Sequence, residues 1–165
     1  MKKIIFILSV LMLISASTSA QFLNPESGDK AVGASFKWGS KVKAPGIGFT
    51  YHQYLSSRFR IAPSLTYFLN RNEQSGWDMS TDAHFIFPIA NEKVRVYPIM
   101  GITLNSIKYH AGSYSGFSNT EVGANVGAGI QYHITGPIFA VGEAKYTIIR
   151  DIDQLGIGIG LTCLF

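Results

Sequence analysis

Beyond about residue 30, apolar residues alternate with small or polar ones along most of the chain, which is the two-residue period of a β-strand. The clearest segment is 120–133, where the even-numbered positions from 122 to 132 are apolar and the odd-numbered ones include Glu121, Asn125 and Gln131. This second face is too polar for a hydrophobic core. The segment is also longer than the strands of ordinary sheets, which average roughly five or six residues.

The same alternation recurs in seven other segments, which are 31–39, 46–54, 58–69, 77–87, 94–105, 139–147 and 155–165. All eight segments have roughly nine to fourteen residues, and a strand needs about 9–11 to cross a bilayer at a tilt. No segment after residue 20 is apolar for the ~20 residues that a membrane helix needs. The predicted fold is therefore all-β: a single eight-stranded antiparallel up-and-down transmembrane β-barrel.

The connections between these strands alternate in character. Short turns are expected at 55–57, 90–93 and 134–137, and longer or more polar loops at 40–45, 70–76 and 106–119, with a shorter loop at 150–154. Transmembrane barrels show this asymmetry, with short periplasmic turns and longer outside loops. An even number of strands then leaves both chain ends on the periplasmic side.

Aromatic residues are expected at both ends of the strands, at the alternate positions whose side chains face outward. Trp38 and Trp77 fall near the loop side, and the turn side carries Phe59, Phe87, Tyr132 and Phe165. Two such belts are typical of the membrane interfaces of a barrel. Pro63 and Pro98 lie inside expected strands, where each removes one ladder hydrogen bond. They mark either bulges or different strand limits.

The first 20 residues follow a different pattern. Lys2 and Lys3 precede an apolar run over 4–14, and small residues follow it up to Ala20. This order is the signature of a secretory signal peptide, with cleavage expected after Ala20. A lipoprotein would need Cys at the next position, which is Gln21. We therefore predict a signal peptide over 1–20 and an outer-membrane β-barrel domain over 21–165.

Charge and cysteine content limit the partners and the covalent cross-links that this chain can have. Removing 1–20 takes away two lysines, so the charge of the mature chain is 12 − 10 = +2, against +4 for all 165 residues. Without clustered Lys and Arg, this charge indicates no nucleic-acid partner. Cys163 is the single cysteine, so no internal disulfide can form, and the exported domain needs another source of stability. A closed ladder, in which every strand is paired on both sides, supplies it.

Most charged residues of the expected strands share the inward face. An eight-stranded barrel is just wide enough inside for its own side chains, and buried charges must pair or stay solvated. Strand glycines, otherwise poor strand formers, would relieve crowding there. We predict a salt-bridge network in which Glu143 and Lys145 reach neighbouring strands, acting as a stabilising plug or, less favoured, as a gate. Its expected members are Lys37, Arg58, Arg60, Asp78, Asp82, Arg95, Glu121, Glu143 and Lys145.

The sequence gives little support for a catalytic, phosphate-binding or metal-binding site. The glycines at 46–51 and 156–161 alternate within strands, whereas a phosphate-binding loop joins a strand to a helix. The four histidines are scattered without metal-ligand spacing. Ser80, Asp82 and His84 share one strand face, but same-face neighbours are ~6–7 Å apart, too far for a nucleophile–base pair. We therefore predict no enzyme, no catalytic residues, no cofactor and no metal site.

Three segments carry a resemblance to a known family: RIAPSLTY at 60–67, VRVYPIMGI at 94–102 and NVGAGIQYHITGPIFAVGEAKYTI at 125–148. They resemble the small outer-membrane β-barrel domains of Gram-negative bacteria, the porin-family or OmpA/OmpX-like eight-stranded group. The resemblance covers essentially all of 30–165. It implies export through the periplasm, localisation in the outer membrane and contact of the apolar face with outer-membrane lipid. The terminal Phe165 resembles the signal that the barrel assembly machinery reads during biogenesis.

Two functions remain open at this point. The first is a structural or interaction scaffold, in which loop 106–119, rich in Ser, Gly and Tyr, is a candidate contact for an extracellular partner or simply a solvated loop. The second is a porin-like channel for ions or very small solutes. A soluble lipocalin-type barrel would need an apolar interior, and here the charges lie on the face opposite the apolar residues.

Overall fold

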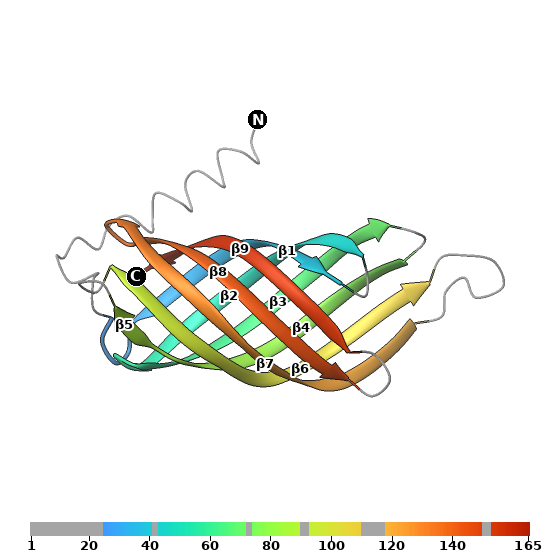
Figure 1. The fold of residues 1–165 in the computed structure, drawn as a ribbon, viewed down its shortest axis with the longest axis horizontal. Helices are drawn as coiled ribbons and strands as arrows, with labels where there is room; N and C mark the ends of the chain where they lie inside the picture. Colours follow the sequence, from blue (N-terminus) through green and yellow to red (C-terminus); the bar gives the residue numbers. More distant parts are fainter. Residues whose placement is uncertain (1–24, 41–42, 72–73, 90–92, 110–117, 150–152) are drawn as a thin grey trace.

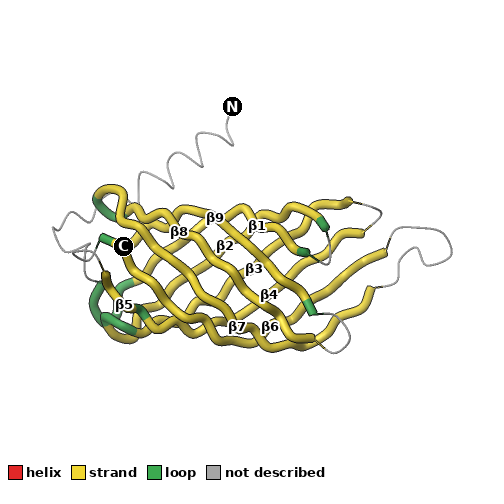
Figure 2. The backbone as a smooth tube through the Cα atoms, in the orientation of Figure 1, coloured by secondary structure: helices red, strands yellow, loops and turns green. Residues whose placement is uncertain are grey.

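A computed structural model describes residues 25–40, 43–71, 74–89, 93–109, 118–149 and 153–165, which form a closed antiparallel barrel (Figures 1 and 2). Consecutive strands pair along the wall except β4 and β5, and the pairs β1–β9 and β4–β6 close it. The strands are β1 (Lys30–Gly39), β2 (Ala44–Ser56), β3 (Phe59–Arg71), β4 (Gln74–Phe85), β5 (Phe87–Ile89), β6 (Val94–Tyr109), β7 (Ser118–Thr135), β8 (Ile138–Ile149) and β9 (Gln154–Leu164). In the part of the chain that the structure describes, no helix has the length and apolarity to span a bilayer. The predicted signal peptide over 1–20 lies outside the described residues.

The wall has the eight predicted strands, because β4 and β5 together form one of them. Both pair with β6 in the same register, and the pairing stops at Ile99 and resumes at Val96. The gap includes Pro98, which has no N–H to donate. On the other side of this strand, the backbone N–H of Ile86, between β4 and β5, donates to the carbonyl of Arg58 at 2.8 Å and continues the register of the β3–β4 ladder. The segment predicted as one strand over 77–87 is thus continuous apart from this local gap.

Pro63 has a comparable effect on one side of β3. It pairs with Thr81 of β4, whereas the ladder to β2 is interrupted between Ser64 and Ile61. The register is the same on either side of this interruption. Both prolines therefore leave one-sided gaps in the ladder, and neither one marks a bulge.

Side-chain burial is the reverse of that in a soluble barrel. Among the described residues, eighteen polar or charged residues are buried against eleven apolar ones. Large apolar side chains face outward instead, such as Ile102, Ile159 and Val122, which are 66 %, 67 % and 70 % exposed. A lipocalin-type interior is excluded by this distribution, and the outer wall has the apolar surface that lipid requires.

Both ends of the described barrel lie at its turn end, as predicted (Figure 1). The N–H of Lys30 donates to the carbonyl of Phe165 at 3.2 Å, and the N–H of Phe165 donates back to Lys30 at 2.7 Å. The short connections 57–58 and 136–137 join β2 to β3 and β7 to β8. Gly136 has a φ of 48°, in the left-handed region that favours glycine.

At the opposite end the strands continue further than predicted. The β6–β7 ladder runs to the pair Lys108–Ser118, so several residues of the expected loop 106–119 belong to strands, and 110–117 lie outside the described residues. Strands also extend into the expected loops 40–45 and 70–76. A strand needs apolar residues on alternate positions only where it faces lipid, whereas hydrogen bonding between strands does not need lipid. Hydropathy therefore underestimates the length of these strands.

Candidate functional site

The candidate site is the lumen, because the inward faces of the strands carry eight of the nine predicted charged residues. The exception is Arg58, which lies in the turn between β2 and β3 and is exposed. Its assignment to the lumen was wrong, because β3 begins at Phe59 and the first inward position of that strand is Arg60. The inward eight are Lys37, Arg60, Asp78, Asp82, Arg95, Glu121, Glu143 and Lys145.

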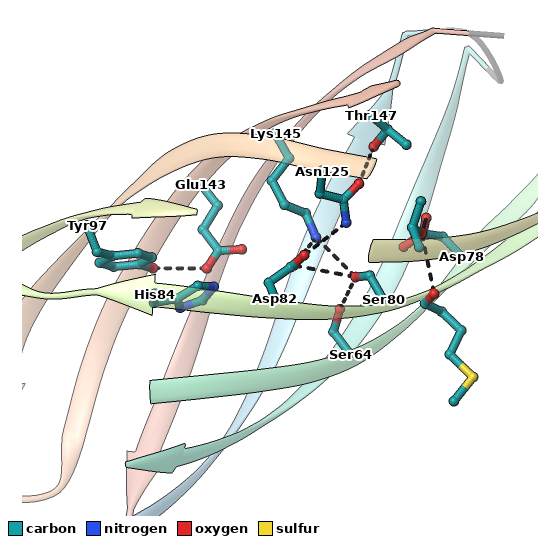
Figure 3. Close-up of polar contacts among 12 residues, drawn as sticks. Ser64, Asp78, Ser80, Asp82, His84, Tyr97, Asn125, Glu143, Lys145 and Thr147 are labelled. Atoms are coloured by element: carbon teal, nitrogen blue, oxygen red, sulfur yellow. Dashed lines mark hydrogen bonds and ion pairs between the residues drawn. The ribbon is translucent and has the colours of Figure 1, made fainter. Parts of the chain in front are cut away.

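An ion pair crosses the middle of the lumen (Figure 3). The Nζ atom of Lys145 on β8 lies 2.7 Å from Oδ2 of Asp82 on β4, and these side chains are 12 % and 4 % exposed. Because β8 and β4 are not adjacent in the wall, the prediction that Lys145 would reach a neighbouring strand was wrong. In so narrow a barrel the opposite wall is within reach of a lysine.

Neutral side chains complete the bonding around Asp82. The Nδ2 amide of Asn125 donates to Oδ1 of Asp82 at 2.9 Å, and the hydroxyl of Thr147 donates to Oδ1 of Asn125 at 2.9 Å. Lys145 also donates to the hydroxyl of Ser80 at 3.2 Å. Strands β4, β7 and β8 are therefore held together through one carboxylate (Figure 3).

Two further contacts extend this network along β4. The hydroxyls of Ser64 and Ser80 lie 2.9 Å apart and link β3 to β4. The hydroxyl of Thr103 donates to Oδ2 of Asp78 at 2.6 Å and links β4 to β6. Asp78 therefore bonds to a neutral hydroxyl of an adjacent strand.

Nearer the turn end, Arg60 is fully buried among neutral and aromatic groups. Its Nε donates to Nδ1 of His84 at 3.0 Å, and its Nη1 donates to the hydroxyl of Tyr54 at 2.8 Å and to Oε1 of Gln131 at 2.9 Å. The guanidinium carbon also lies 4.6 Å from the ring centroid of Tyr97, within cation–π range. Predicted as part of a salt-bridge network, Arg60 instead forms its hydrogen bonds with uncharged partners.

Tyr97 contacts both Arg60 and the carboxylate of Glu143. Its ring stacks on His84 with centroids 4.8 Å apart, and its hydroxyl donates to Oε1 of Glu143 at 2.9 Å (Figure 3). A Cβ on Gly129 would overlap the Tyr97 ring, so this glycine makes room for it. The expectation that strand glycines relieve luminal crowding is met at this position. Arg95, also buried, lies with its guanidinium carbon 5.1 Å from the ring centroid of Phe139.

The serine, aspartate and histidine of β4 do not form a catalytic arrangement. Nδ1 of His84 accepts a hydrogen bond from Arg60, and Ser80 is hydrogen-bonded to Ser64 and Lys145. Ser80 approaches Asp82 at 3.5 Å, the outer limit of a hydrogen bond. Within the described residues, no group of three or more His, Cys, Asp and Glu side chains could hold a metal ion.

Space left in the lumen includes two small cavities. One, of about 20 Å³, is lined by Ser35, His52 and Glu143 among others, and the other, of about 30 Å³, by Lys37, Thr66 and again Glu143. A cavity of ~10–15 Å³ by this measure holds one water molecule.

Sequence reasoning centred on the charged residues, although much of the bonding is neutral. Tyr54, Gln131, Asn125 and Thr147 all make hydrogen bonds in the lumen. Their inward parity was the signal that could have identified them, because a buried polar group in a strand must find a partner. Parity gives no information on which partner that is.

Comparisons with known proteins agree with this architecture. Residues 6–165 match the family model described as outer membrane protein beta-barrel domain. No curated protein matches the chain.

Several solved structures share the fold. The N-terminal β-barrel domain of Pseudomonas aeruginosa OprF has a TM-score of 0.73 at 22 % identity, over 86 % of this chain and 100 % of that one. Neisserial surface protein A has a TM-score of 0.65 at 17 % identity, over 82 % of this chain and 95 % of that one. Ail of Yersinia pestis has a TM-score of 0.63 at 16 % identity, over 84 % of this chain and 99 % of that one. With the apolar outer wall and the family match over nearly its whole length, the chain belongs to the outer membrane protein beta-barrel domain family and is a protein of the outer membrane.

Proposed function

We propose that this protein is a non-enzymatic, non-conducting scaffold, whose bonded lumen stiffens a barrel that displays its loops outside the cell. The observation that carries the proposal is the Lys145–Asp82 ion pair, which crosses the lumen at 2.7 Å. Asn125 and Ser80 surround it with further hydrogen bonds. If this contact broke inside the lumen, two buried charges would lose their partners, which is unfavourable.

A porin-like channel is the alternative. Conduction requires a continuous path in which an ion keeps its hydration shell or exchanges it for protein ligands. The two luminal cavities, about 20 and 30 Å³, are each of a size for one or two water molecules. This packing favours the plug.

Conductance in a planar bilayer distinguishes the two functions. The barrel is refolded, and a shift between heated and unheated gel samples first establishes that it has folded. We expect a silent bilayer with the folded protein. Steady, reproducible conductance that changes in Arg95→Gln or Glu143→Gln would contradict the scaffold and establish a small pore.

The partners proposed for the scaffold differ at its two ends. Outer-membrane lipid contacts the apolar wall, and the barrel assembly machinery is the proposed partner of Phe165 during biogenesis. At the loop end, the ladder of β6 and β7 extends to Lys108–Ser118 and supports the connecting loop, which we propose as the contact for an extracellular partner. Ail of Yersinia pestis, which shares the fold, has been crystallised with the heparin analogue sucrose octasulfate. We also propose that residues 1–20 are a signal peptide and 21–165 the mature barrel.

A further inference from the structure

The outer wall of the barrel has a groove along β8. Two hollows of about 640 and 590 Å³ lie over β7, β8 and β9, which are neighbours in the wall (Figure 1). The hollows share Ile130, Gly142 and Ile159, so they form one continuous groove. We propose that this groove binds one acyl chain of a phospholipid from the leaflet at the turn end of the barrel. The proposal goes beyond the scaffold function, because it concerns a ligand of the outer wall and holds whether or not the lumen conducts.

Small residues of β8 form the floor of the groove. Ala140, Gly142 and Ala144 occupy successive outward positions of this strand and line the two hollows. Gly142 pairs with Ile130 of β7 on one side and with Ile159 of β9 on the other. Because neighbouring strands lie ~4.8 Å apart, these two apolar side chains are roughly 9–10 Å apart with no side chain between them. The floor is therefore flanked by an apolar ridge on each side.

The packing of the barrel itself does not require glycine at position 142. Among the glycines of the described strands, Gly142 alone is on the outward face. A Cβ on the inward Gly127 or Gly160 would overlap backbone atoms of the paired strand, whereas a Cβ on Gly142 would only reach ordinary contact with Ile130, at 3.4 Å. The φ of Gly142 is also outside the left-handed region. The space that this glycine leaves open is therefore on the lipid side of the wall.

The lipid around the barrel supplies the occupant of the groove. The floor and both ridges belong to the apolar outer wall, so the groove is continuous with the surface that faces lipid. In a membrane, association of apolar surfaces is driven by van der Waals packing. A chain in the groove is contacted by the floor and by both ridges, so it gains more such contacts than a chain on the convex wall beside it. We therefore expect it to exchange with the surrounding lipid more slowly than other chains do.

A second copy of the barrel fits the groove less well than an acyl chain does. The groove follows β8, and the strands of transmembrane barrels are tilted by about 35–45°. Two copies that are inserted in the same direction face each other across a twofold axis along the membrane normal. Their strands would then cross at about 70–90°, twice the tilt, and the ridges of one copy would lie across the groove of the other. A flexible acyl chain can follow the groove along its whole length.

The position of the groove along the strands assigns the leaflet. Ala140 is the third residue of β8 (Ile138–Ile149) counted from the turn end, and Ala144 is the seventh of twelve. Tyr132, an outward aromatic residue of the turn end, lines the same end of the groove as Ala140. A chain that enters beside Tyr132 therefore reaches the middle of the membrane from the turn side. Because the short turns of such barrels lie in the periplasm, the lipid is a phospholipid of the periplasmic leaflet.

A photoreactive phospholipid locates the site. The folded barrel is reconstituted in nanodiscs of phosphatidylethanolamine and phosphatidylglycerol that contain a small amount of phosphatidylethanolamine with a diazirine in one acyl chain. After illumination, we expect adducts to concentrate on the groove, at Ile130 and Ile159, with few on the outward residues of β2 and β3. Adducts spread evenly around the wall would overturn the proposal.

Filling the groove tests whether one lipid is held firmly there. Native mass spectrometry of the barrel released from these nanodiscs should show one phospholipid that survives the activation that removes the others. Gly142→Leu should abolish this retained lipid, and so should Ala144→Leu, in which the replaced side chain already faces outward. Ala83→Leu, at an outward position of β4, is the matched control and should keep the lipid. A heat-shifted gel band establishes folding of each variant.

Three outcomes of this measurement would overturn the proposal. The first is a lipid that is retained equally in the folded groove variants. The second is retention only from nanodiscs that also contain lipid A, which would assign the groove to the other leaflet. The third is a dimer without retained lipid that Gly142→Leu dissociates, which would make a second copy the occupant.

Discussion

Asp82 is the residue on which most of the luminal bonding converges. One carboxylate oxygen contacts Lys145 and the other accepts from Asn125, while Ser80 lies at the limit of hydrogen bonding. The charge of such a buried group is tolerated only because its partners replace water. The stability of the lumen should therefore depend more on keeping Asp82 paired than on the number of charges.

A comparison of single and double variants tests this dependence. Lys145→Met leaves Asp82 buried without its cation and should destabilise the barrel by about 3–5 kcal/mol. Adding Asp82→Asn should recover most of this loss, because the asparagine oxygen still accepts from Asn125 and no charge remains buried. Urea unfolding of the barrel in lipid vesicles measures both variants. A double variant no more stable than Lys145→Met would show that the loss comes from packing.

At this scale, the sequence predicted which side chains point inward but not which atoms bond. Parity placed Lys145, Asp82 and Arg60 inside correctly. It did not indicate that Lys145 would bond across the lumen, or that Arg60 would prefer Tyr54 and Gln131. Those choices depend on the relative stagger of strands far apart in sequence, and hydropathy carries no information on that stagger.

At the scale of the strand, contact with lipid constrains the side chains, and hydrogen bonding between strands constrains the backbone. Lipid requires apolar side chains on every second position, and this alternation made the strands predictable. The hydrogen-bond ladder depends on the backbone alone, so it runs past the alternating segments in β6 and β7 and has gaps at Pro63 and Pro98 without losing register. Strand number and facing were thus predictable from the sequence, whereas strand ends were not.

The position of a residue along a strand should determine the cost of a charge on the outer wall. Ile159 lies in the middle of β9 and is 67 % exposed, and Leu55 lies beside the turn after β2 and is 47 % exposed. Ile159→Arg should destabilise the barrel by about 2–4 kcal/mol and Leu55→Arg by about 0–1 kcal/mol. Guanidinium unfolding in lipid vesicles measures both. Equal costs would show that Ile159 does not face the hydrocarbon core.

At the scale of the whole molecule, closure depends on the two ends of the described barrel. β1 and β9 are the first and last strands, and their ladder from Ala31–Leu164 to Gly39–Gly156 closes the wall. Phe165 extends it through its two backbone bonds with Lys30. The side chain of Phe165 itself points outward and is 43 % exposed, so it contributes little to the packing inside the barrel.

Because the backbone of Phe165 bonds to Lys30 while its side chain points outward, replacing the side chain alone tests the assembly role proposed for Phe165. Phe165→Ala keeps both backbone bonds to Lys30, so purified protein should refold in vesicles with nearly unchanged stability. In cells, the same variant should reach the outer membrane in smaller amounts and accumulate in the periplasm. The accumulated protein should have the mass of a chain that begins at Gln21, because cleavage of the signal peptide precedes assembly. Tyr132→Ala, at another outward aromatic of the turn end that is 51 % exposed, is the matched control. If both variants assemble equally well, Phe165 is only one more residue of the aromatic belt; if both fail equally, the belt as a whole is needed for insertion.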